Sequence, residues 1–403
     1  MMESSDVVII GGGLVGLAFA CALKGSGLQL TLIESQPTPT PLPEPKLPAK
    51  REGARLASGV SPRVSAINRK SRSFLSRIGG WPNSAGCMAD YEGMVVWDTQ
   101  GTASISFSAS EIKQDCLGTI VENAAIVSQL YETADGLDNL ELLFEAELES
   151  IEKSDGGYLV RLKGGREIQS GLVVGADGGQ SRVKKLAGLK SVDWSYHQTA
   201  VVTTVETEQP HDGNARQWFT SQGPLAFLPL ANKNYCSIVW SSTEHEQILE
   251  LNEQAFCDQL TRVTGKQTGA VMACDKRFSF PLTQRHAVQY TRENLALIGD
   301  AAHTIHPLAG QGVNLGFSDA ETLAQTLHQC RVEGQNPGDL QVLKRYENRR
   351  KPENMLMAAV MEGFKRLFGS DEPGVRWLRN SGLRLVNGTG VLKTMVAKLA
   401  AGA

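Results

Sequence analysis

A run of apolar residues that ends in three glycines constrains the fold of this chain more than any other feature. The segment Gly11-Gly12-Gly13-Leu14-Val15-Gly16 contains the pattern G-x-G-x-x-G. Residues 6–10 before it are rich in β-branched side chains, and residues 14–24 after it are typical of a helix. A second apolar run, residues 28–33, ends at Glu34. We therefore predict a β-α-β unit at the N-terminus, with the glycines between its first strand and its helix.

Each glycine of the pattern is required for a different physical reason. Gly11 permits a tight turn, Gly13 lets the backbone approach a pyrophosphate, and Gly16 lets the helix pack close to the strand. The N-terminus of the helix then offers free N–H groups to a phosphate. Glu34 lies where a carboxylate can accept both ribose hydroxyls, and it would repel a 2′-phosphate. The dinucleotide contacts predicted in this unit are Gly11, Gly13, Leu14, Val15, Gly16 and Glu34.

A second polar turn follows another short apolar strand. Val173 and Val174 precede Gly175-Ala176-Asp177-Gly178, which we expect at the carboxyl edge of the same sheet. The carboxylate of Asp177 suits two roles. It can hold backbone amides of the turn, or it can orient the cofactor or a reductant. The residues favour neither role, so both stay open.

The third segment carries most information about the kind of dinucleotide. Residues 295–298 predict a strand that delivers Asp300 to its carboxyl end, and Gly310-Gln311-Gly312 open a helix over residues 313–328. A second helix N-terminus suits developing negative charge, such as the N1–C2=O edge of a reduced flavin, and Asp300 suits ribityl hydroxyls. A ligand that reaches both this segment and the first is long, which favours FAD. The contacts predicted here are Asp300, Pro307, Gly310, Gln311, Gly312, Val313 and Asn314.

The middle of the chain changes to an alternating pattern between residues 199 and 282, which predicts an antiparallel sheet. Phe227, Trp240 and Phe280 in this stretch suit the lining of a substrate pocket and equally suit the core of the sheet. We therefore predict an α/β fold in which a Rossmann-like domain carries an inserted, mainly antiparallel β domain. The predicted ranges are 1–85, 117–193 and 283–365 for the FAD-binding domain, 86–116 and 194–282 for the substrate domain, and 366–403 for a C-terminal amphipathic helical segment.

Composition narrows the class of protein. The chain has 403 residues, a length that suggests two domains, and its formal net charge of −3 gives no reason to expect a nucleic-acid partner. We find no signal peptide and no stretch apolar enough to span a bilayer, which predicts a cytoplasmic protein. The seven cysteines are dispersed without a C-x-x-C pair. We expect each to be a buried small side chain, with no disulfide framework and no metal site.

The three polar segments, in this order, resemble the single-component FAD-dependent aromatic hydroxylases typified by p-hydroxybenzoate hydroxylase. The narrower similarity is to the hydroxylases of ubiquinone biosynthesis, in particular to the branch that hydroxylates 2-polyprenylphenols at ring carbon 5. The stretches that carry it are 63–68 (RVSAIN), 120–123 (IVEN), 226–230 (AFLPL), 237–241 (SIVWS), 306–316 (HPLAGQGVNLG) and 345–351. The proline-rich stretch from Gln36 to Pro48, with the residues that follow it to Ser61, is longer than this family leads us to expect.

This resemblance implies a monooxygenase cycle. NAD(P)H reduces FAD, the reduced flavin and O2 form a C4a-hydroperoxide, and a polyprenylphenol attacks the distal oxygen. The resemblance also places Arg63 near the flavin, and it implies that NAD(P)H binds transiently at the shared cleft, because no separate nicotinamide domain is present. His303 and His306 are the candidates for proton handling, since imidazole titrates near neutrality. The simpler interpretation, which we favour, is that both pack and hydrogen-bond within their turn.

The C-terminal end has no acidic residue after Glu372. Five basic residues alternate there with apolar ones, which suits an anionic membrane surface or a partner subunit equally well. Possible partners therefore include the membrane, a second copy of the chain and other proteins of ubiquinone biosynthesis. Three other functions stay open: a sister ubiquinone hydroxylase that acts at another ring position, a different FAD-dependent reaction on a prenylated or aromatic substrate, and a non-catalytic flavoprotein scaffold.

Overall fold

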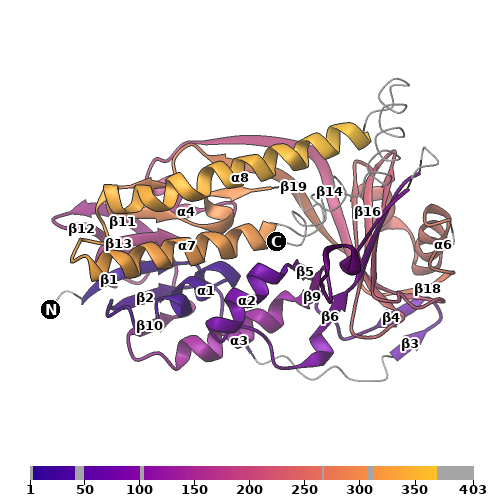
Figure 1. The fold of residues 1–403 in the computed structure, drawn as a ribbon, viewed down its shortest axis with the longest axis horizontal. Helices are drawn as coiled ribbons and strands as arrows, with labels where there is room; N and C mark the ends of the chain where they lie inside the picture. Colours follow the sequence, from indigo (N-terminus) through magenta and orange to yellow (C-terminus); the bar gives the residue numbers. More distant parts are fainter. Residues whose placement is uncertain (1–2, 41–49, 100–103, 266, 306–311, 370–403) are drawn as a thin grey trace.

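The N-terminal glycine pattern folds into the predicted β-α-β unit. The computed structural model describes residues 3–40, 50–99, 104–265, 267–305 and 312–369, shown in colour in Figure 1. Strand β1 (Glu3–Ile10) leads through the glycines into helix α1 (Leu14–Ala22), and β2 (Leu30–Ile33) pairs parallel with β1. The apolar residues of both strands are buried in one apolar cluster that also contains residues of α1.

The first sheet contains the strand order β10-β2-β1-β13-β12-β11. Strand β21 pairs with the last residues of β13, beyond the part that pairs with β12. Pairing is parallel from β10 through β2 and β1 to β13 and β21, whereas β11, β12 and β20 are antiparallel additions. The remaining bounds are β10 (Leu140–Leu143), β11 (Leu148–Ser154), β12 (Gly157–Leu162), β13 (Glu167–Gly175), β20 (Thr291–Arg292) and β21 (Leu295–Leu297). The parallel strands place the predicted polar turns at one edge.

Helices from distant parts of the chain complete the layers on this sheet. Helix α1 packs against α7 and α3, and α7 packs against α8, so one apolar cluster contains residues of all three sequence segments. The helices are α2 (Arg69–Arg77), α3 (Asn123–Asp135), α4 (Arg182–Leu186), α7 (Gly312–Val332) and α8 (Leu340–Gly369). Helix α8 runs from the first sheet to the second, as Figure 1 shows.

The second sheet has the order β3-β4-β18-β14-β17-β16-β15-β7-β8, and β19 pairs with β14 and β22. It is mainly antiparallel as predicted, although β7 pairs parallel with β15 and β4 parallel with β18. The bounds are β3 (Lys50–Glu52), β4 (Arg55–Ala57), β7 (Gly93–Asp98), β8 (Ser104–Ser108), β14 (Ser191–Thr207), β15 (Asn214–Thr220), β16 (Gly223–Pro229), β17 (Tyr235–Ser242), β18 (Val271–Cys274), β19 (Phe278–Ala287) and β22 (His303–Thr304).

Two details of the second sheet differ from the sequence-based expectation. Strands β3 and β4 lie within residues 1–85, which we assigned to the first domain, yet they pair in the second sheet. Three-residue strands are too short to show a period in the sequence, which explains the difference. Helices α5 (His245–Glu250) and α6 (Glu253–Val263) interrupt the strands, and the alternating pattern did not reveal them. They cover one face of the sheet.

A small third sheet has the strand order β5-β9-β6, and Figure 1 shows it beside the second sheet. Its strands are β5 (Val64–Ile67), β6 (Met88–Tyr91) and β9 (Gly118–Glu122). All seven cysteines are buried and free, which confirms their prediction as small core side chains. Within the described ranges no helix is long and apolar enough to cross a membrane. The C-terminal segment predicted over residues 366–403 lies outside the described residues beyond Gly369.

Candidate active site

The glycine turn between β1 and α1 has the geometry that its three glycines predict. Gly11 has φ +108°, and a Cβ there would lie 2.5 Å from the carbonyl oxygen of Ala176. A Cβ on Gly16 would lie 1.8 Å from the carbonyl oxygen of Gly11, so the helix starts in backbone contact with the strand. By contrast, a Cβ on Gly13 would meet no atom within 4 Å. The turn is thus closed on its inner side and open at Gly13, on the side where a pyrophosphate would approach.

Glu34 is held at the end of β2, beside this turn. Its Oε2 accepts a hydrogen bond from the Gly12 backbone N–H at 2.6 Å, and its Oε1 accepts one from Gln36 at 2.8 Å. Each carboxylate oxygen can accept further bonds. The carboxylate is therefore fixed in direction beside the glycines, where we expect the ribose.

The first and third predicted segments meet at the side chain of Val15. A Cβ on Gly299 would lie 3.1 Å from Cγ2 of Val15, and one on Gly316 would lie 2.6 Å from the same atom. Gly299 opens the short helical turn η3 (Gly299–Ala301), and Gly316 lies in the first turns of α7. Only glycine fits at these close approaches, so the start of α1, the turn with Asp300 and the start of α7 form one surface.

Asp300 occupies an unusual position on that surface. Its side chain keeps exposed area, yet protein surrounds the carboxyl group, and this burial raises the pKa of Asp300 above its ordinary value. The positive charges of His303, when protonated, and Arg63 act in the opposite direction. The surface around Asp300, which is exposed to solvent yet surrounded by protein atoms, is called the recess below, and it suits a residue that meets the hydroxyl groups of a ligand.

Arg63 joins the recess to the second sheet. It directly precedes β5, and its guanidinium lies 4.4 Å from the centre of the Phe280 ring on β19. The charge of the same guanidinium partly opposes the upward shift that burial gives to the pKa of Asp300. Arg63 and Asp300, which the resemblance and the motif predicted separately, thus interact electrostatically, and a third candidate, Phe280, lies beside Arg63.

Asp177 has a structural role that the structure shows directly. Its Oδ2 accepts hydrogen bonds from the backbone N–H groups of Arg182 at 2.6 Å and Val183 at 3.0 Å, at the start of α4. Its Oδ1 is buried and has no hydrogen-bond partner among the described residues. Oδ2 therefore caps the N-terminus of α4. Oδ1 is the atom that can still contact the cofactor.

Helix α7 begins at Gly312, followed by Val313 and Asn314. The Asn314 side chain is buried. Its Oδ1 accepts from the Asn68 N–H at 3.0 Å, and its Nδ2 donates to the Ala66 carbonyl at 2.8 Å. Its side chain therefore ties α7 to the end of β5. The other predictions of this segment, His306, Pro307, Gly310 and Gln311, lie outside the described residues.

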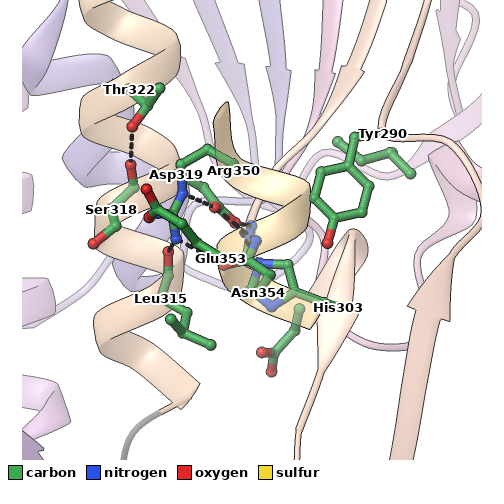
Figure 2. Close-up of polar contacts among 12 residues, drawn as sticks. Tyr290, His303, Leu315, Ser318, Asp319, Thr322, Arg350, Glu353 and Asn354 are labelled. Atoms are coloured by element: carbon green, nitrogen blue, oxygen red, sulfur yellow. Dashed lines mark hydrogen bonds and ion pairs between the residues drawn. The ribbon is translucent and has the colours of Figure 1, made fainter. Parts of the chain in front are cut away.

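His303 is buried and bonded to helix α7. Its Nε2 lies 2.5 Å from Oδ2 of Asp319, which belongs to α7, and its Nδ1 has no partner among the described residues. Figure 2 shows Asp319 in turn bonded to Arg350 and Asn354 of α8. This arrangement agrees with the packing role that we favoured for His303.

Sequence reasoning did not identify Asp319, Arg350 or Asn354. The available signal was a lone carboxylate on an otherwise apolar face of the helix, because Leu315, Gly316 and Leu323 lie four residues before, three residues before and four residues after residue 319. A charge at a core position requires a buried partner.

The three aromatic candidates for the substrate pocket lie on two different faces of the second sheet. Phe227 and Trp240 are fully buried in an apolar cluster with Trp218 and with Phe256 of α6. Phe280 packs on the other face with Ala200, Val202 and Leu282. The structure therefore places Phe227 and Trp240 in the core of the sheet, which was the alternative interpretation, and Phe280 beside Arg63.

The sequence and the fold match known proteins. Residues 83–360 match the FAD binding domain family, and residues 6–48 match the pyridine nucleotide-disulphide oxidoreductase family. The chain is 35% identical to 3-demethoxyubiquinol 3-hydroxylase of Escherichia coli over 99% of both chains. It is 34% identical to ubiquinone hydroxylase UbiL of Rhodospirillum rubrum, with 99% of this chain and 90% of that protein covered. It is 32% identical to the human ubiquinone biosynthesis monooxygenase COQ6, with 98% and 92% covered.

A solved structure with the same fold is p-nitrophenol 4-monooxygenase PnpA of Pseudomonas putida, at a TM-score of 0.78 and 20% identity over 98% of this chain and 97% of that one. The predicted fold class is thereby confirmed. The open glycine turn, the fixed Glu34 and the recess at Asp300 fit FAD, and the chain is an FAD-dependent monooxygenase of a class that uses NAD(P)H. It belongs to the family of FAD-dependent hydroxylases of ubiquinone biosynthesis.

Proposed function

We propose that this enzyme hydroxylates the aromatic ring of a polyprenylated phenol in ubiquinone biosynthesis, at ring carbon 5. The observation that carries the proposal is the full-length similarity to relatives whose names specify ubiquinone or its precursors. The polyprenyl chain of such a substrate partitions into a bilayer. We therefore propose that the enzyme works in the cytoplasm at the inner membrane surface.

The residues of the site divide the work as follows. The open turn at Gly13 and the first amides of α1 hold the pyrophosphate, with Leu14 and Val15 in that first turn, and Glu34 binds the ribose. Asp300 and the backbone at the start of α7 meet the ribityl chain and the ring. When bound, FAD supplies oxygen activation and accepts the electrons of NAD(P)H.

The substrate ring lies, in this proposal, against the face of the second sheet that carries Phe280. Arg63 stands between this face and Asp300, so its cation is available to both the cofactor and the substrate. The free oxygen of Asp177 remains the candidate contact for cofactor or reductant. Enclosing the aromatic ring of the substrate between these groups excludes water from the site. The exclusion of water favours hydroxylation over release of the reduced oxygen as hydrogen peroxide.

The decisive experiment follows oxygen into the ring. The purified holoenzyme is incubated with NADH or NADPH, labelled O2 and a short-chain polyprenylphenol, and the product is analysed by mass spectrometry and NMR. We expect one labelled oxygen at carbon 5 and near-equal amounts of nicotinamide oxidised and product formed. A substrate with a methyl group at carbon 5 is the matched control and should give only peroxide. Nicotinamide oxidation without any oxygenated product would contradict the proposal and favour the scaffold or another flavin reaction.

A second ring position has its own support. The relative with 35% identity is named for 3-hydroxylation of a demethoxyubiquinol, whose ring is more substituted than that of a simple phenol. If the labelled product forms from a demethoxyubiquinol but not from the polyprenylphenol, the sister activity replaces carbon 5. Precursor analysis in a strain that lacks this gene would then show accumulation of the demethoxy compound.

A further inference from the structure

The two polar groups that flank Asp300 in the turn are bonded to the same carboxylate. The backbone N–H of Gly299, directly before Asp300, donates to Oδ2 of Asp319 at 3.1 Å. His303, three residues after Asp300, bonds the same oxygen through Nε2. A single side chain on α7 therefore holds both ends of the turn that presents Asp300 to the recess.

The other oxygen of Asp319 is bonded to α8. Its Oδ1 accepts from Arg350 Nε at 2.8 Å and from Asn354 Nδ2 at 3.1 Å. Arg350 also donates to the Asn354 side chain at 2.7 Å and pairs with Glu353. Figure 2 shows that Arg350 and Asn354 of α8 converge on Asp319 of α7. All four bonds of the carboxylate are made by protein, two at each oxygen.

This carboxylate is ionised although it is completely buried. Burial opposes ionisation, but His303 and Arg350, with their hydrogen bonds, hold the pKa of Asp319 below its ordinary value. An ion pair of this kind is costly to bury, and apolar side chains of similar volume often stabilise a core better. Hydrogen bonds to the carboxylate have preferred directions, whereas apolar contacts do not. The two hydrogen bonds that one oxygen of Asp319 accepts can therefore fix the orientation of a turn.

His303 acts here as a support. Asp319 accepts a hydrogen bond from the Nε2–H of His303, and Nδ1 of the same ring has no partner among the described residues. A proton carrier would need a partner at the second nitrogen, leading toward the site. The ring of Tyr290, whose centre lies 5.9 Å away, packs beside it instead.

We propose that Asp319 is a positioning residue for the reaction: by bonding Gly299 and His303 together, it fixes the turn that presents the Asp300 carboxyl group to FAD. Arg350 and Asn354 hold Asp319 in place. This inference rests on the proposed contact between Asp300 and the cofactor. It assigns a role in the reaction to three buried residues that lie outside the recess.

The test compares Asp319→Asn with Glu347→Gln. Glu347 is a matched control because it is also a buried carboxylate at the α7–α8 side of the sheet, bonded to Thr291 at 2.5 Å and to Lys344 at 2.7 Å, and it does not touch the turn. We expect Asp319→Asn to weaken FAD binding about ten- to hundredfold, the size of one or two lost charge-assisted hydrogen bonds. It should also shift the reduction potential of bound FAD and lower kcat with little change in KM.

Glu347→Gln should lower the melting temperature comparably and leave FAD affinity and potential unchanged. Equal losses of FAD affinity in the two variants would show that Asp319 only stabilises the fold, and would overturn the inference. If Asp319→Asn does not fold, His303→Leu removes one end of the support and keeps the Asp319–Arg350 pair. It should then weaken FAD binding in the same direction, and an unchanged FAD affinity would overturn the inference.

The variant Asp300→Asn tests the proposed contact between Asp300 and FAD separately from the role of Asp319. These measurements need no substrate, so a wrong ring position does not affect them. If Asp300→Asn leaves FAD affinity and potential unchanged, the proposed place of the cofactor is wrong and the inference fails with it. If Asp300→Asn has a large effect and Asp319→Asn has none, the inference alone fails.

Discussion

The first and second sheets present different kinds of surface at the site. The first offers backbone: glycine turns at the ends of parallel strands, where a Cβ would strike carbonyl oxygens at Gly11 and Gly16. The second offers side chains on one of its two faces. Phe227 and Trp240 point to the side covered by α5 and α6, whereas Phe280 points to the side of Arg63.

This difference determines what each region tolerates. A backbone surface depends on the absence of side chains, so a single methyl group is enough to destroy it. A side-chain surface depends on which way each residue points along a strand, because neighbours alternate between the two faces. The first region therefore shows its ligand site in its sequence, and the second requires the register of its strands before the site is visible.

The largest expected effect distinguishes two glycines of the same turn. Gly16→Ala places a Cβ 1.8 Å from the Gly11 carbonyl, so we expect a loss of at least about 3 kcal/mol in the free energy of unfolding. Gly13→Ala meets no atom and should fold normally, but should weaken FAD binding at least about tenfold, which is about 1.4 kcal/mol. Denaturant unfolding and FAD titration measure the two effects. Unchanged FAD affinity in Gly13→Ala would remove the pyrophosphate from this position.

The next effect separates the two faces of the second sheet. Trp240→Ala leaves a large cavity in the core and should cost about 3–5 kcal/mol. Phe280→Ala should cost less, about 0.5–2 kcal/mol from its contact with Arg63, and should raise KM for the aromatic substrate. Unfolding curves and steady-state kinetics on both variants test this. A larger change of KM in a folded Trp240→Ala enzyme would reverse our assignment of the faces.

A smaller effect concerns His286, where β19 meets β22 at the junction of the two regions. Burial, then His303 and Lys351, lower the pKa of His286 from 6.5 to about 4, against a weaker opposite effect of Asp319. The unfolded chain therefore binds this proton first, and stability should fall by up to about 3 kcal/mol as the pH drops from 6.5 to 4. His286→Gln should lack this part of the acid sensitivity. Equal slopes of unfolding free energy against pH in both proteins would contradict it.

The smallest effect is a gain in stability. The pKa of Asp300 is raised in the folded chain, so its contribution to stability is present at low pH and is lost as the pH rises through the folded pKa. In cofactor-free protein, Asp300→Asn should therefore unfold at a slightly higher temperature than the parent at pH 8, but not at pH 4. Asp177→Asn, which weakens the cap of α4, should instead lower the melting temperature at pH 8. A destabilised Asp300→Asn protein would show that burial does not dominate at this carboxyl.

The local features of the site were predictable because they depend on neighbours in the chain. The β-α-β unit, the roles of Gly11 and Gly16, and the strand that delivers Asp300 all follow from short-range periodicity and from the steric needs of a turn. The free, buried cysteines followed from their spacing. FAD and the family followed from the order of three motifs.

Tertiary structure alone decided which distant side chains meet. The pairing of Asp319 with His303, Arg350 and Asn354 joins three segments, and no local pattern specifies such a contact. The register of β14 with β17 and β19 decided that Trp240 faces α6 and that Phe280 faces Arg63. A one-residue shift would exchange those faces. The sequence by itself thus determined the cofactor and the turns that hold it, whereas the packing of helices and the pairing of strands decided what surrounds them.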